Sequence, residues 1–301
     1  MSLVSNYSQW EKLPTEAVHA FSRNLDRASE SSILDAMAKE DHGAVEAVRG
    51  EAARIRKGAS KLASALSAGG RVFYVGAGTS GRLGVLEAAE CPPTFGTSPR
   101  EIDAIMAGGD EAVFHSKEDA EDDVSGGRKA LRARRLSKKD VVVGISASSV
   151  TPFVAGALLY ARERAAATVL VTCGPRRRGV ADVVVAPAVG PELLAGSTRM
   201  KAGTATKLVL NQMTLLAMIR LNKVYGPYMV DVKTTSAKLR DRALRMVVAL
   251  ADVDRERAAA LMAEAGNHVK TAVVMGRLDL SRSEAMRRLE EASFDLRRVL
   301  K

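Results

Sequence analysis

The chain has 301 residues, of which 47% are apolar and 27% are charged, and its formal net charge is +10. This composition is typical of a globular protein and excludes general intrinsic disorder. Its two cysteines, Cys91 and Cys173, are too few for a disulfide framework and lack zinc-ligand spacing. The first residues also lack the pattern of a signal peptide. We therefore expect a cytoplasmic protein.

The positive charge raises the question of a nucleic-acid partner. The densest cluster, Arg128 to Lys139, directly follows an acidic run from Glu118 to Asp123. Together they are typical of one helix with acid at its start and base at its end. Only 4% of residues are aromatic, so few side chains could stack on bases. We expect a small-molecule ligand, no nucleic acid and no membrane partner.

In chain order, the first long element is a helix over residues 42–68, where apolar residues recur every three or four positions. Its predicted core stripe is Val45, Val48, Ala52, Ile55, Ala59, Leu62 and Leu66, and Gly69 and Gly70 end it. A short strand, 71–75, then enters a glycine turn. The next helix, 82–90, is expected to stop before Pro92 and Pro93.

Further strands are expected at 102–106, 141–145, 168–172 and 183–186, with helices between several of them. The uncharged run Val141 to Ala161 has serines, a threonine and a proline at its centre, so it predicts strand, loop and helix instead of a membrane span. Alternating strands and helices predict an α/β fold with a parallel sheet covered on both faces.

A long helix is expected from Ser197 to Asn222, then a linker over 224–235. The remainder is expected to be helical only, including segments 254–265 and 281–292. We predict three parts, listed here by residue number: an N-terminal helical arm at 1–40, an α/β domain at 41–235 and a C-terminal helical bundle at 236–301.

The glycine turn Gly76-Ala-Gly78-Thr79-Ser80-Gly81 follows a strand and opens a helix. It matches the GxGxxG dinucleotide pattern, but an acidic residue ending the second strand is missing, with Asp110 as a possible substitute. Its paired hydroxyls favour a helix N-terminus that receives a single phosphate. A purely structural turn is the third interpretation.

A second hydroxyl loop, Ser146 to Thr151, follows the strand at 141–145 and precedes a helix that Pro152 can start. Both loops fall at the carboxyl end of the sheet, where ligands bind in such folds. Helix capping is the alternative interpretation of these serines.

Carboxylates provide further candidates. Glu90 is expected at a helix C-terminus, where the dipole opposes a negative charge, so its position hints at a function. The acidic run around Glu121 could be a solvated helix start. Glu192, Ser197 and the nearby cations Arg199 and Lys201 could reach an anionic sugar or cap the long helix.

Four segments together resemble the N-acetylmuramic acid 6-phosphate etherases of the sugar isomerase (SIS) superfamily, whose relatives include the glucokinase regulatory protein. They are GAGTSGRLGVLEAAECPPTFG (76–96), AGGDEA (107–112), AEDD (120–123) and VGPELLAGSTRMKAGTATKLVLNQM (189–213). The resemblance implies a SIS-type parallel sheet sandwiched by helices, with a small C-terminal helical segment like a ubiquitin-associated (UBA) domain. It also implies a homodimer that needs no metal or other cofactor.

The implied activity is a lyase that cleaves the D-lactyl ether of N-acetylmuramic acid 6-phosphate during cell-wall recycling. The resemblance implies that Glu90 protonates the leaving lactate and that Glu121 removes the C2 proton. The resemblance further implies that the domain at 41–235 is a SIS sugar-phosphate domain, and that substrate binding falls to these residues: Gly78, Thr79, Ser80, Ser146, Ser148, Glu192 and Ser197.

One segment departs from the family. Members usually have AASGRTP where this chain has Ser146-Ala147-Ser148-Ser149-Val150-Thr151-Pro152, so a glycine is replaced by Ser149 and an arginine by Val150. Loss of a cation beside an anionic substrate removes a charge-assisted contact. A sugar-phosphate-sensing regulatory protein and a sugar-phosphate isomerase of the same superfamily are therefore the rival hypotheses.

Overall fold

The computed structural model describes residues 13–149 and 151–301. It contains two compact units. The first runs up to Ala89 and resumes from Arg100 to Leu216, and the second comprises Glu90–Pro99 and Ala217–Lys301. The three-part division at residues 40/41 and 235/236 stays a prediction.

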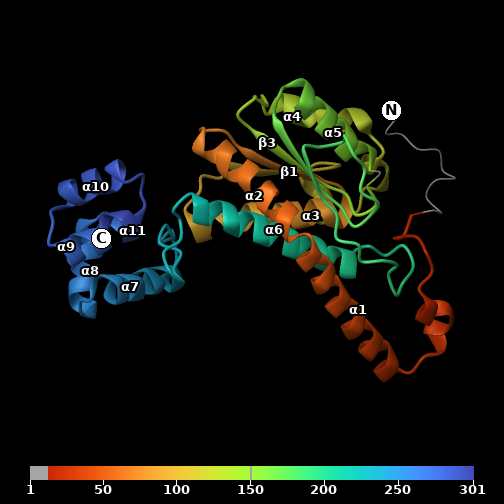
Figure 1. The fold of residues 1–301 in the computed structure, drawn as a ribbon, viewed down its shortest axis with the longest axis horizontal. Helices are drawn as coiled ribbons and strands as arrows, with labels where there is room; N and C mark the ends of the chain where they lie inside the picture. Colours follow the sequence, from red (N-terminus) through yellow and green to blue (C-terminus); the bar gives the residue numbers. More distant parts are fainter. Residues whose placement is uncertain (1–12, 150) are drawn as a thin grey trace. The chain divides into compact units, whose positions relative to one another are not determined.

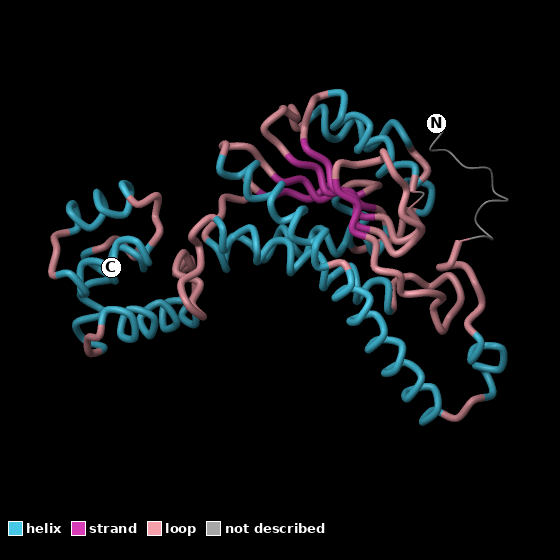
Figure 2. Tube along the Cα trace, in the orientation of Figure 1, coloured by secondary structure: helices cyan, strands magenta, loops and turns pink. Residues whose placement is uncertain are grey.

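The first unit is built on a five-stranded parallel sheet with strand order β2-β1-β3-β4-β5 (Figures 1 and 2). The strands are β1 (Val72–Gly76), β2 (Ile102–Met106), β3 (Val141–Ile145), β4 (Ala167–Val171) and β5 (Val183–Val185). Each predicted strand is confirmed to within one residue at either end. The α/β class and parallel sheet are confirmed with them.

Helices cover both faces of this sheet (Figure 1). On one face lie α4 (Val124–Ala133) and α5 (Pro152–Glu163). Phe73 and Val142 of the strands and Leu158 of α5 are buried in the core between these helices and the sheet. The other face carries α2 (Ala52–Ser67), α3 (Gly78–Phe95) and α6 (Lys201–Arg220). There the hydroxyl groups of Tyr74 in β1 and Thr214 in α6 lie 2.8 Å apart, which ties the helix to the strand.

The uncharged run Val141 to Ala161 is confirmed as strand, loop and helix, since it contains β3 and most of α5. Among the described residues, no helix combines the length and apolar character needed to cross a membrane.

The single helix predicted over 42–68 is wrong. The structure has α1 (Glu30–Gly50) and α2, separated at Glu51. The buried Glu51 carboxylate bonds the Arg176 guanidinium at 2.5 Å and the Ala186 N–H at 3.1 Å, so tertiary contacts hold the break. Val45, predicted in the core, is 46% exposed.

Helix α3 also differs from its prediction, because it continues through Pro92 and Pro93 to Phe95. Proline removes a donor from the helix, but its fixed φ is compatible with helical backbone. The helix ends at Gly96, whose φ is +66° and whose N–H donates to the Pro92 carbonyl at 3.1 Å. Glu90 therefore lies before the last turn, and the dipole argument for its function does not hold.

The acidic and basic runs at 118–139 do not form one helix. A short 3-10 turn, η4 (Glu118–Glu121), comes first, and α4 starts after it. The Asp123 carboxylate caps α4 by accepting the N–H groups of Ser125 and Gly126, each at 2.9 Å. Two other short 3-10 helices are η2 (Ala20–Arg27) and η3 (Asp110–Val113).

After the predicted linker, the second unit is helical from Ala237 onward, as predicted. After the end of α6 it contains α7 (Ala237–Ala251), α8 (Arg255–Glu264), α9 (Val269–Leu278), α10 (Arg282–Glu291) and α11 (Leu296–Val299). Their apolar faces share one core that includes Val247, Leu261 and Leu289. Ser281 and Glu284 form a capping box at the start of α10. The likeness to a UBA domain stays a prediction.

Candidate active site

A cavity of about 290 Å³ lies at the carboxyl ends of β1 and β3, which are neighbours in the sheet. Both hydroxyl loops singled out in the sequence contribute to it. The lining residues are Leu13, Glu16, Ala77, Gly78, Thr79, Ser80, Glu121, Asp122, Ala147, Ser148, Thr151, Pro152, Gly196 and Thr198. The structure thus brings together Gly78, Thr79, Ser80, Ser148 and Glu121 from the predicted site.

The first wall is the N-terminus of α3. Gly78 opens the helix with a φ of +52°, a conformation that glycine adopts without strain. Gly76 lets the turn approach the strand, because a Cβ there would lie 2.6 Å from the Gly81 nitrogen. Thr79 and Ser80 follow in the first helical turn, where backbone N–H groups have no helical partner. This wall therefore offers hydroxyl groups and N–H donors to an anion.

The second wall is the start of α5. Pro152 occupies the first turn, and Thr151 precedes it as the N-cap. Ser146 is buried and does not line the cavity, but its hydroxyl lies 2.9 Å from that of Thr151. The structure thus places Ser146 behind the cavity, where it holds a lining residue, and places Ser148 on the cavity wall.

Ser149 explains how this chain accommodates the departure from the family pattern. Its φ is +69°, in the left-handed region that favours glycine. Its hydroxyl lies 2.6 Å from the Thr172 hydroxyl and donates to the Pro175 carbonyl at 3.1 Å. These bonds fix the Ser149 side chain in the loop between β3 and α5. The other departure, Val150, lies outside the described residues.

Carboxylates form the third part of the wall. Glu121 ends η4 and Asp122 follows it, while Glu16 comes from the N-terminal segment. Glu121 also lines an adjoining cavity that includes Arg82 and Lys117. Glu90 is exposed, belongs to the second unit and does not line the 290 Å³ cavity.

Glu192 and Ser197 are placed differently from the hydroxyl loops. Glu192 is 1% exposed and accepts the N–H groups of Lys201 at 3.2 Å and Ala202 at 2.9 Å, so it caps α6. Burial raises the pKa of Glu192, although these two bonds oppose the rise. It lines a separate cavity with Lys201 and Arg199. Ser197 lines neither cavity, although Gly196 and Thr198 on either side of it line the first.

Sequence reasoning missed Leu13, Glu16 and Thr198 as lining residues. Leu13 and Glu16 belong to a segment without a helical or strand periodicity, so no local pattern marks them. Only the tertiary structure brings this segment to the loops after β1 and β3.

Comparison with known proteins places these observations in a family. Residues 54–162 match the family described as the glucokinase regulatory protein N-terminal SIS domain. The N-acetylmuramic acid 6-phosphate etherase of Gloeobacter violaceus is 50% identical over 87% of this chain and 87% of its own length. The protein of that name from Trichodesmium erythraeum is 44% identical over 99% of this chain and 98% of its own length.

This chain belongs to the N-acetylmuramic acid 6-phosphate etherase family. The family predicted from the four sequence segments is thereby confirmed. Among solved structures, this etherase-family chain is similar to phosphoheptose isomerase GmhA from Neisseria gonorrhoeae, with 19% identity and a TM-score of 0.45. That match covers 62% of this chain and 98% of the isomerase.

The charges that line the cavity at the carboxyl ends of β1 and β3 are unusual for a phosphate site. Its described lining residues include three carboxylates and no Lys, Arg or His. An anion there must be bound by hydroxyl groups and by the N-termini of α3 and α5, whose dipoles favour negative charge. Within residues 13–149 and 151–301, no group of three or more His, Cys, Asp or Glu side chains is arranged to hold a metal ion.

Proposed function

We propose that this chain is an enzyme that cleaves the D-lactyl ether of N-acetylmuramic acid 6-phosphate, a carbon-oxygen lyase that releases N-acetylglucosamine 6-phosphate and D-lactate. Relatives at 44–50% identity over most of the chain carry the etherase name. The observation that carries the proposal is a single cavity in which Glu121 faces the hydroxyl-bearing N-termini of two helices. The proposed base, Glu121, and the phosphate-binding groups at these two N-termini, which we call the phosphate cradle, thus line the same cavity.

The phosphate group binds to Thr79, Ser80 and Ser148 and to the N-termini of α3 and α5. Hydroxyl and N–H donors form shorter and stronger bonds to a phosphate than to a neutral acceptor. Because no cation lines the described part of the cavity, these donors supply the attraction there. The phosphate then fixes the sugar relative to Glu121.

The reaction is an elimination followed by addition of water. In the open-chain aldehyde the carbonyl acidifies the C2 proton, and Glu121 removes it. The electron pair forms the C2–C3 double bond, the C3–O bond breaks, and the lactate oxygen takes a proton from a general acid. Water then adds across the double bond, with hydroxide at C3 and a proton at C2. The sum is substrate plus water to phosphosugar plus D-lactate.

Glu90 is the general acid in this proposal, on the strength of the ECPPT segment that carries the family resemblance. Because Glu90 does not line the cavity of its own chain, we assign it to the cavity of a second copy in a homodimer. Symmetric pairing of two copies gives two equivalent sites, each with Ser80 from one chain and Glu90 from the other. Glu192 supports such a site indirectly, by capping α6.

Mixed dimers test this assignment. Ser80→Asp blocks the cradle of one chain, and Glu90→Gln removes the acid of the other. If Glu90 acts across the dimer, equal amounts of the two inactive chains assembled together recover about a quarter of wild-type activity, since half the dimers are mixed and each has one intact site. If Glu90 acts within its own chain, no activity is recovered, and the assignment across the dimer is wrong.

The proposed activity itself is tested by enzymatic detection of D-lactate released from N-acetylmuramic acid 6-phosphate. Glu121→Gln should lower kcat by about 10²- to 10⁴-fold, the usual contribution of a general base. Asp119→Asn is the matched control, because Asp119 lies in the same short helix but does not line the cavity. Phosphosugar binding without lactate release by the wild type would refute the lyase and favour a sugar-phosphate sensor.

The compartment is part of the same proposal. Cys91 and Cys173 are both buried, and neither forms a disulfide. Cysteines that form no disulfide in a chain of this size are typical of a reducing environment. We therefore assign the enzyme to the cytoplasm.

A further inference from the structure

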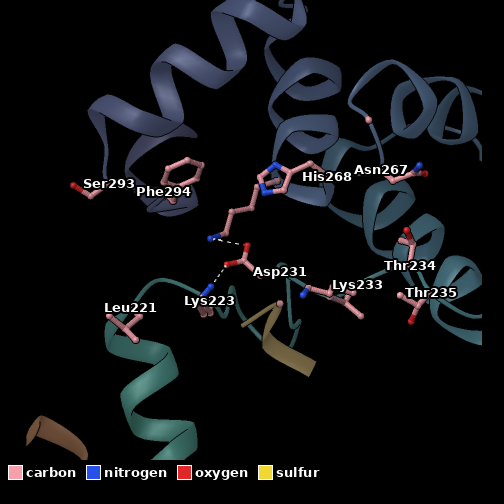
Figure 3. Close-up of a pocket in the computed structure, with 14 residues that line it drawn as sticks. Leu221, Lys223, Asp231, Lys233, Thr234, Thr235, Asn267, His268, Ser293 and Phe294 are labelled. Atoms are coloured by element: carbon pink, nitrogen blue, oxygen red, sulfur yellow. Dashed lines mark hydrogen bonds and ion pairs between the residues drawn. The ribbon is translucent and has the colours of Figure 1, made fainter. Parts of the chain in front are cut away.

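A second cavity, of about 650 Å³, lies wholly within the second unit (Figure 3). We call it the lysine cavity, after Lys223, Lys233 and Lys270, which line it together with Asp231 and His268. Two of the lysines come from the segment that follows α6, and Lys270 comes from the first turn of α9. The proposed etherase reaction uses none of these residues.

The charges in the lysine cavity are not balanced. Lys270 is 1% exposed, and its Nζ lies 2.9 Å from Oδ1 of Asp231. Lys223 reaches the same carboxylate, with its Nζ 3.1 Å from Oδ2 (Figure 3). Lys233 donates to the Thr97 carbonyl at 3.1 Å, so it has a neutral partner. The described lining residues of the cavity therefore include three ammonium groups and one carboxylate, and Lys223 and Lys270 contact that carboxylate.

His268 adds no negative charge and little positive charge at neutral pH. Burial lowers its pKa, and the neighbouring Lys270 and Lys223 lower it further, against the opposing effect of Asp231. Its Nδ1 lies 2.6 Å from the Thr271 hydroxyl. The lining residues of the cavity thus carry a net charge of +2, from three lysines and one aspartate.

A buried ammonium group is costly unless its charge is paired. Burial lowers the pKa of Lys270, although Asp231 opposes this shift. Asp231 must divide its charge between Lys270 and Lys223, so the floor of the cavity has room for further negative charge. A phosphate monoester carries about −1.5 to −2 at pH 7, which matches the excess.

The backbone around the lysine cavity is also unusual. Asn267, Ser293 and Phe294 line it and have φ values of +63°, +53° and +57°. Asparagine adopts a positive φ readily, but a bulky residue such as Phe294 seldom does. Strained positions of this kind cluster at ligand sites, where the surrounding structure fixes them. Their side chains and that of Thr235 present amide, hydroxyl and aromatic groups at the cavity wall.

We propose that the lysine cavity binds a small phosphate monoester, with the phosphoryl group held by Lys223, Lys233 and Lys270. The polar remainder of the ligand contacts Asn267, Ser293 and Thr235. The volume suits such a molecule, since small-ligand pockets commonly measure about 300–1,000 Å³. This site is separate from the cavity at β1 and β3, and the proposal does not depend on the etherase reaction.

Equilibrium binding of radiolabelled inorganic phosphate to the full chain tests the proposal. The wild type should bind two phosphates per chain, one in each cavity. Ser80→Asp should abolish one of them and leave the other. Lys223→Gln combined with Lys233→Gln should weaken the remaining phosphate at least about tenfold, because two charge-assisted contacts are lost. Lys233 is exposed and Lys223 is half-buried, so a thermal melt of the double variant checks that the fold is retained.

Lys238→Gln is the matched control, since it removes the same charge from an exposed position in α7 that does not line the cavity. It should bind both phosphates like the wild type. Loss of all bound phosphate in Ser80→Asp would overturn the proposal, and so would unchanged binding in the double lysine variant. If the etherase cradle itself were wrongly placed, Ser80→Asp would change nothing while the lysine variant still lost phosphate.

Discussion

Replacement of Ser80 by aspartate should abolish phosphate binding without unfolding the protein, so it distinguishes a loss of binding from a loss of stability. Ser80 lies in the first turn of α3 and lines the cavity at the ends of β1 and β3. An acidic residue in a first helical turn is favoured by the helix dipole by about 0.3–1 kcal/mol. The same carboxylate would face the phosphate of the substrate. Because repulsion from the lining carboxylates opposes the effect of the dipole, Ser80→Asp should change the melting temperature little and abolish productive binding.

The size of the effect follows from the composition of the cavity. Loss of the hydroxyl alone, in Ser80→Ala, removes one hydrogen bond to a charged group, about 1.5–3 kcal/mol, or about 10- to 150-fold in kcat/KM. Two unit charges about 4 Å apart near a protein surface repel by about 4 kcal/mol. With no described lining cation to screen it, the aspartate should lower kcat/KM by about 10³-fold or more.

The assay is D-lactate release over a range of N-acetylmuramic acid 6-phosphate concentrations, with a thermal melt of each variant. Since the phosphate is remote from the reacting carbons, Ser80→Ala should raise KM with little change in kcat. Ser146→Ala is the informative comparison, because Ser146 bonds Thr151 but does not line the cavity. A kcat/KM within threefold of wild type in Ser80→Asp would refute the phosphate cradle.

Three further predictions concern stability and reactivity. At pH 7, Asp140→Asn should lower the free energy of unfolding by about 2–3 kcal/mol in urea titrations, because the Asp140 carboxylate accepts the N–H groups of Arg71 and Ser137 and the Arg71 guanidinium. Burial by itself would raise the pKa of Asp140, but these bonds outweigh it and lower the pKa. The stabilisation by Asp140 is complete above the unfolded-state pKa of about 4 and is lost as pH falls through the lower folded-state pKa. The free energies of unfolding of wild type and Asp140→Asn should therefore converge in acid, and a constant difference between them would contradict the argument. Ser149→Ala should destabilise the protein more than Ser149→Gly in the same titrations. Both variants lose the two hydrogen bonds of the hydroxyl, but only alanine is strained at the positive φ, so the reverse order would show that φ is not decisive. Burial raises the pKa of the Cys173 thiol to about 12, so iodoacetamide at pH 8 should label Cys173 only after unfolding, and rapid labelling of the native protein would contradict its burial.

Local patterns predicted much of the fold because they reflect short-range physics. Runs of β-branched residues such as Val141 to Val143 are typical of buried strands. The turn from Gly76 to Gly81 requires glycine at positions of close approach, so it is recognisable without a structure. Where local signals misled, distant contacts decided the outcome. The break at Glu51 depends on Arg176 and Ala186, which no pattern near residue 51 reveals.

The sequence likewise predicted some features of the candidate site, whereas the roles of individual side chains depended on the tertiary structure. The sequence by itself determined the parallel α/β fold, the etherase family and the two loops whose hydroxyl groups line the cavity, because these depend on residue type and on spacing along the chain. Only the tertiary structure decided that Ser148 lines that cavity while Ser146 supports Thr151 from behind it. It alone brought Lys223, Lys233 and Lys270 to one cavity, where Lys223 and Lys270 contact the Asp231 carboxylate. Electrostatic balance in a cavity depends on distances through space between residues far apart in the chain, and a sequence does not contain those distances.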